Sequence, residues 1–153
     1  MLNNFTECLV QKNVQNNCQK KYRIAIGKVW CVQMKKWTKA LVTEQYIVSC
    51  AVIQSATLIG DYKSANKEKD KLLSAFKWLE KNIHEASGVL GELLHNSSPV
   101  VQTKAAAHCL CLQINQDEAL HVLETVSKRS DIWGFNAEKV LEVYQKNGFL
   151  KAY

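Results

Sequence analysis

The amino-acid sequence predicts an all-α fold of five to six helices, and three observations carry that prediction. One proline and six glycines in 153 residues leave few positions at which a helix must stop. From Met34 onward, apolar residues recur at spacings of three and four, which is the period of one helix face. Residues typical of helix caps stand at the ends of these periodic segments. Because no apolar run approaches the roughly 20 residues of a membrane-spanning helix, a membrane protein is not expected.

The first two helices are predicted on either side of a short turn. The first covers Trp37–Ile59 and should end at Gly60, since glycine readily adopts the left-handed conformation of a helix C-terminus. The second runs from Tyr62 to about Asn82, with Asp61 as its N-cap. The inward residues expected for the first helix are Leu41, Val48, Val52 and Ala56. Those expected for the second are Ala65, Leu72, Phe76 and Leu79.

A short helix near Val89–His95 and a longer one over Pro99–Gln113 are predicted next. Ser98 is a suitable N-cap for the longer helix. Pro99 then occupies the first helical position, where its missing N–H costs nothing. Leucines are expected to fill the core from the short helix, namely Leu90, Leu93 and Leu94. The longer helix is expected to bury Val101, Ala105, Cys109 and Leu112.

A fifth helix is predicted to begin after Asn115 and to run to about Lys128. Glu118 follows Asn115 at the third helical position, so the two side chains are expected to satisfy backbone donors reciprocally, as in a capping box. The basic residues at its end suit the negative pole of the helix. The expected inward residues are Ala119, Val122, Leu123 and Val126.

The last helix is predicted over Ala137–Asn147. Trp133, Gly134 and Phe135 are expected to form an aromatic loop before it, with Asn136 as the N-cap. Gly148 stands where a left-handed residue would end the helix.

Residues 1–33 differ from the rest of the chain. They hold nine Asn or Gln residues, no sustained helical period and a net charge of +4, whereas residues 34–153 carry only +2. We therefore expect an atypical N-terminal extension before a single helical domain at 34–153. A loosely attached, poorly ordered segment is one interpretation of it, and an over-long gene model with Met34 as the true start is the other.

The sequence predicts no metal, no cofactor and no catalytic activity. The six cysteines form no CxxC pair, and the string from His108 to Cys111 lacks the spacing of structural zinc sites. No nucleophile elbow, phosphate-binding loop or dinucleotide-binding turn occurs. Reduced thiols in a cytoplasmic protein are the simplest interpretation. Lysines after residue 60 alternate with acids, which is typical of a solvated helix face rather than a nucleic-acid interface.

Two sets of motifs carry a family resemblance. The stretch Ser97–Leu110 resembles the inner helix of a HEAT repeat, although Gln102 stands where such repeats usually have arginine. The strings at Gly60–Lys67, Asp117–Glu124, Gly134–Glu138 and Asn147–Leu150 occur in an order that resembles a small bacterial family. That family is the domain of unknown function number twenty-nineteen, with a HEAT-like fold. The resemblance implies antiparallel helix pairs stacked in a short right-handed solenoid.

The resemblance also implies a non-enzymatic binding role. Proteins of this kind look like immunity proteins that neutralise polymorphic or contact-dependent bacterial toxins by stoichiometric binding. A nuclease is one candidate target, which would call for an acidic surface on one face. The acids available for it are Asp61, Glu68, Asp70, Glu80, Glu85, Glu92, Asp117 and Glu118. The alternatives are a general helical-repeat adaptor, or a nucleic-acid binder that uses the basic N-terminal region.

Two groups of side chains are candidates for contact with the partner. The polar group is Asp61, Tyr62, Asn66 and Asp70, and the aromatic group is Trp133 and Phe135. Each has a structural alternative, because Asp61 can be a helix cap and Asn66 a local brace between helices. Either aromatic residue, Phe135 above all, can instead fold back as a lid on the last helices.

Overall fold

The structure is a computed structural model that describes residues 36–151. Over these residues the chain forms helices and no strands, which confirms the all-α prediction. The predicted extension at residues 1–33 lies outside the described residues. The helices are α2 (Lys39–Ile59), α3 (Tyr62–Lys81), α4 (Ile83–Leu94), α5 (Pro99–Leu112), α6 (Gln116–Ser127) and α7 (Ile132–Asn147).

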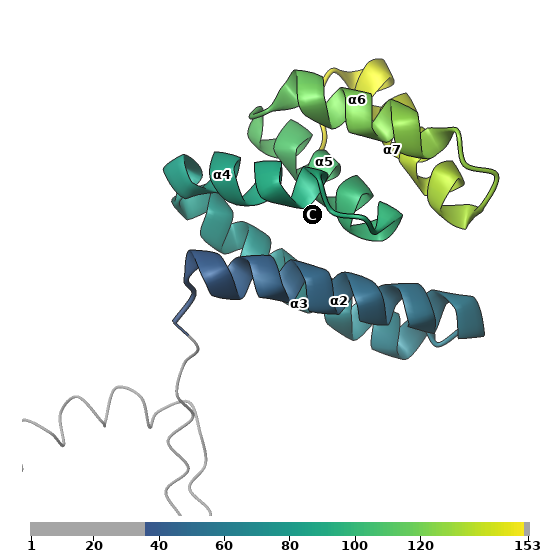
Figure 1. Ribbon diagram of the computed structural model, residues 1–153, viewed down its shortest axis with the longest axis horizontal. Coiled ribbons are helices and arrows are strands. Elements are labelled where there is room, and N and C mark those ends of the chain that lie inside the picture. The colour runs from purple at the N-terminus through teal and green to yellow at the C-terminus, as the bar shows by residue number, and fades with distance from the viewer. Residues whose placement is uncertain (1–35, 152–153) are drawn as a thin grey trace, which may run out of the picture. The chain divides into compact units, whose positions relative to one another are not determined.

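The helices pack mainly on their neighbours in the chain (Figure 1). α2 packs along α3, α4 along α5, and α6 along α7, while α5 also contacts α6 and α7. α2 touches α4 and α5, and α3 touches α4. The middle helices α4 and α5 therefore lie between the first pair, α2 and α3, and the last pair, α6 and α7. One continuous apolar core joins all three layers.

The turn between α2 and α3 has the predicted chemistry. Gly60 ends α2 with φ of 74°, in the left-handed region that glycine adopts without strain. Asp61 Oδ1 then accepts a hydrogen bond of 3.1 Å from the backbone N–H of Ser64, so it is the N-cap of α3. All four predicted inward residues of α3 are buried.

The inward face of α2 differs from the prediction. Its buried residues are Val42, Tyr46, Ser49, Cys50, Ile53 and Ala56. Of the residues expected there, Ala56 is buried, whereas Val48 is 50% exposed and Val52 38% exposed. The prediction was wrong for these two because α2 has apolar residues on both faces. Spacing alone could not decide which face meets the core.

α4 begins six residues earlier than predicted. Asn82 ends α3 and also precedes Ile83, so the two helices meet at one residue. The two glycines inside α4 do not stop it. A side chain at Gly91 would come within 3.2 Å of Asn115 Nδ2, so this glycine makes room for the residue before α6.

The predicted reciprocal cap at Asn115 was wrong. Asn115 has φ of 47° and makes no side-chain bond to its own helix. Its Oδ1 accepts a hydrogen bond of 2.9 Å from Ser87 Oγ, and its Nδ2 donates one of 2.9 Å to the carbonyl oxygen of Ser87. The side chain thus ties the start of α6 to α4.

The predicted aromatic loop is the first turn of α7. Asp131, rather than Asn136, caps the helix, because its Oδ1 accepts hydrogen bonds from the backbone N–H groups of Trp133 and Gly134. Gly134 is buried at this corner, where an added Cβ would lie 2.1 Å from the carbonyl oxygen of Arg129. The glycine is therefore needed for close approach of the backbone and does not break the helix. Gly148 ends α7 in the left-handed conformation, as predicted.

Candidate partner-binding site

The outer face of α2 carries exposed apolar side chains. Ile47 is 42% exposed, and it lies beside Val48 and Val52 on the face that points away from the core. A helix with one face in a core normally carries polar residues on the other. Contiguous exposed apolar side chains mark sites of interaction.

Ile47 and Val48 line an open groove of about 630 Å³. Its lining residues are Lys39, Ala40, Thr43, Glu44, Ile47, Val48 and Glu92. All except Glu92, which comes from α4, belong to the first half of α2. The α2 residues fall into two rows with a spacing of four, so they form parallel ridges along the helix.

The groove carries negative charge that the described residues leave unpaired. Lys39 Nζ lies 3.7 Å from Glu85 Oε2, so the only cation of the lining already faces a carboxylate. Among residues 36–151, neither Glu44 nor Glu92 has a hydrogen bond or ion pair through its carboxylate. An apolar floor with two carboxylates suits a partner that is apolar and basic.

A second acidic area lies on α4 and α6. His95 Nε2 is 2.9 Å from Glu118 Oε1, which links the end of α4 to the first turn of α6. Asp117 and Glu124 are exposed on the same helix as Glu118. By contrast, Glu68 is buried and is not part of an acidic surface.

The structure places the polar candidate residues at the start of α3. Asp61 is the N-cap, and hydrogen bonds from the side chain and backbone N–H of Ser64 lower its pKa. Asn66 Oδ1 accepts a hydrogen bond of 3.3 Å from Lys69 Nζ within α3. Tyr62 and Asp70 are exposed.

The two aromatic candidates differ in burial. Trp133 is 8% exposed and belongs to the core, whereas Phe135 is 55% exposed. The expectation that Phe135 folds back as a lid was therefore wrong. Its ring lies 5.2 Å from Lys139 Nζ, one turn further along α7. Because α3 packs on α2 and α4 while α7 packs on α5 and α6, the polar and aromatic groups lie on different helix pairs.

Asp61 can be tested as a cap and as a contact at the same time. We expect Asp61→Ala to lower the melting temperature by about 4 °C, because it removes the hydrogen bond to the N–H of Ser64. Asp61→Asn keeps a capping oxygen and should melt close to the unaltered protein. A loss of partner binding in both variants, without a change in melting temperature, would assign Asp61 to the interface instead.

The interior holds a polar cluster that sequence analysis missed. Tyr46 Oη and His108 Nδ1 are 2.6 Å apart, and the ring of Phe76 stacks at 4.4 Å from that of His108. Burial lowers the pKa of His108 to about 3 and raises that of Tyr46 well above its ordinary value. The half-buried Lys104 adds to the lowering at His108. A neutral imidazole here joins α5 to α2 and α3.

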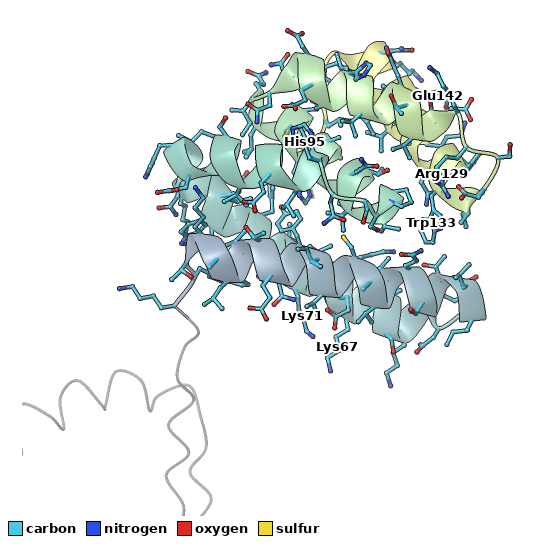
Figure 2. All side chains as sticks on the ribbon, viewed as in Figure 1. Lys67, Lys71, His95, Arg129, Trp133 and Glu142 are labelled. Carbon is cyan, nitrogen blue, oxygen red and sulfur yellow. The ribbon has the colours of Figure 1, made fainter. Side chains whose placement is uncertain are left out.

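A second interior contact involves a carboxylate. Glu68 Oε2 accepts a hydrogen bond of 2.8 Å from Ser49 Oγ, and Glu68 Oε1 lies 2.5 Å from Lys71 Nζ. These bonds, led by the one from Lys71, lower the pKa of Glu68. Because Ser49 lies on α2, the Glu68 carboxylate joins α3 to α2. Figure 2 shows Lys67 and Lys71 on the side of the first pair that points away from the other helices.

The described cysteines Cys50, Cys109 and Cys111 are free thiols. Burial raises the pKa of Cys50 and of Cys109 to about 12, so both are thiols at neutral pH. Over residues 36–151, no three His, Cys, Asp or Glu side chains gather as a metal site would require. In the same part of the chain, no helix has the length and apolar character needed to cross a membrane.

Comparison with known proteins found no match to a family model, a curated protein or a solved structure. The proposal of a function therefore rests on the surfaces described above. The predicted membership of family number twenty-nineteen therefore stays a prediction.

Proposed function

We propose that this protein is a HEAT-like helical scaffold that acts by stoichiometric binding, as an immunity protein for a cognate bacterial toxin. It performs no chemistry of its own. Its helix pairs stack as a short right-handed solenoid, a proposal supported by the position of α4 and α5 between the other two pairs. Neighbouring pairs in such a stack present continuous surfaces to a partner.

The observation that carries the proposal is the groove on α2. A helix that sends Val42 and Tyr46 into the core also exposes Ile47, Val48 and Val52. Keeping this apolar face in water is unfavourable, and covering it with a partner would recover the free energy of burial.

The interior polar groups support binding rather than catalysis. Tyr46 and His108 bond to each other, and Glu68 bonds to Ser49 and Lys71. A general base needs a pKa near the working pH and access to a substrate. His108, with a pKa of about 3, is poorly suited to that role.

The charge of the surface supports a basic target. Glu44 and Glu92 line the groove, and Glu118 lies with two further acids on α6. Toxins that act on nucleic acids present basic surfaces to the phosphate backbone. An inhibitor of such a toxin gains association rate and specificity from opposite charge.

Co-expression tests this function directly. The C-terminal domain of a secreted toxin encoded beside this gene should arrest growth when produced alone. Production of the present chain should restore growth, and the two should purify as a one-to-one complex. Continued arrest with both proteins soluble would contradict the immunity role. A general adaptor, which is the alternative function, would not restore growth, so the absence of rescue would favour it.

A further inference from the structure

We infer that the groove on α2 holds a basic amphipathic helix of the partner protein. The inference rests on the proposed binding function and names the chemistry of the partner segment. The juxtaposition behind it is the exposed Ile47 and Val48 beside two carboxylates, one on α2 and one on α4, that have no partner among the described residues.

The shape of the groove suits a helix. Its α2 lining forms one row at Lys39, Thr43 and Ile47, and a second at Ala40, Glu44 and Val48. Val52 continues the second row, which then spans about 18 Å at a rise of about 1.5 Å per residue. Ridges with a spacing of four accept the side chains of another helix between them. Ala40 leaves room for close approach at one end.

The floor requires apolar side chains from the occupant. Ile47, Val48 and Val52 all lie on the outer face, and each is more than a third exposed. Over residues 36–151 no helix of the same chain packs over them. An occupant with leucines at helical spacing would cover all three, as in other helix-in-groove interfaces.

The rim requires basic side chains. Glu44 and Glu92 come from different helices, and neither carboxylate is paired with a described residue. Lys39 lies 3.7 Å from Glu85 and supplies one positive charge against these two carboxylates. A lysine or arginine of the occupant would meet carboxylates from α2 and α4.

Two synthetic helical peptides of equal length serve as probes. One carries leucines on one face and lysines on the other, and the second has glutamates in place of the lysines. We expect the full-length protein to bind the lysine peptide at least tenfold more tightly than the glutamate peptide, with affinity that falls as salt rises. Equal affinity for the two peptides would overturn the inference.

Four variants locate the binding to the groove. The double variant Glu44→Gln with Glu92→Gln should weaken binding of the lysine peptide about tenfold, because it removes both rim charges. Val48→Asp should weaken it by at least as much. The matched controls are Glu138→Gln and Val143→Asp, at two exposed positions of α7. Controls that weaken binding as much as the groove variants would overturn the inference.

The outcome separates this inference from the proposed function. Growth rescue by the groove variants at the level of the unaltered protein would overturn the inference and leave the immunity role intact. Selective peptide binding without growth rescue would support the groove and contradict the immunity role. A dimer that dissociates in Val48→Asp would show a second copy as occupant and overturn the inference. Unchanged melting curves of the glutamine variants, whose changes are confined to the surface, would exclude loss of folding as the cause of weaker binding.

Discussion

Gly134→Ala is expected to destabilise the fold by about 3 kcal/mol or more, because among the described glycines only Gly134 would place an added Cβ closer than 3.0 Å to other atoms. The new Cβ would lie 2.1 Å from the carbonyl oxygen of Arg129 and 2.8 Å from its carbonyl carbon. Both are backbone atoms, so no side chain can rotate away. The start of α7 must shift, and Trp133 and the capping bonds of Asp131 must shift with it.

A matched substitution gives the opposite result. Gly88 is exposed inside α4, and an added Cβ would meet the flexible Lys39 Nζ at 3.4 Å. Gly88→Ala should stabilise the protein by about 0.5–1 kcal/mol, because alanine is the better helix former. Chemical denaturation of both variants measures the difference. Equal stability of the two would contradict the close approach at Gly134.

The second large effect is a loss of stability in mild acid that depends on His108. In the unfolded chain this side chain takes up a proton near its ordinary pKa of 6.5, whereas in the fold the pKa is about 3. The unfolded state therefore binds more protons between these values, and stability falls as the pH falls through that window. Between pH 6.5 and pH 5 the loss amounts to about 2 kcal/mol.

His108→Asn isolates this contribution. Asparagine does not titrate and can still bond to the hydroxyl of Tyr46. Its free energy of unfolding should change less between pH 7 and pH 5 than that of the unaltered protein, by about 2 kcal/mol. Carboxylates stay largely ionised over this range, so the comparison reports on His108. Parallel pH profiles for the two proteins would show that His108 titrates normally in the fold.

Local chemistry made several boundaries predictable. Gly60, Asp61 and Gly148 behave as the sequence suggests, because their conformations and bonds involve residues within one turn. The corner before α7 was mispredicted because Asp131 and Asn136 are both good caps, and Gly134 resembles a breaker. Gly134 is needed because an added Cβ would clash with the backbone of Arg129, and sequence periodicity does not report that contact.

The candidate site was less predictable than the fold. Val48 and Val52 were expected in the core, and their outward position follows from how Tyr46 and Ile53 meet α3, α4 and α5. The sequence did contain a signal of this surface, because α2 has apolar residues on two faces. Two apolar faces on one helix imply a neighbour on each side. The choice between the rows is made by tertiary packing. Similarly, the side chain of Asn115 bonds to Ser87, 28 positions earlier, instead of capping its own helix.

The position of α4 and α5 has a consequence for the alignment of the outer pairs. α5 meets α2 on one side and α6 and α7 on the other, and buried alanines at 105 and 106 allow close approach. The first pair therefore meets the last pair mainly through these two central helices. The alignment of the outer pairs thus depends on how α4 and α5 pack against each other.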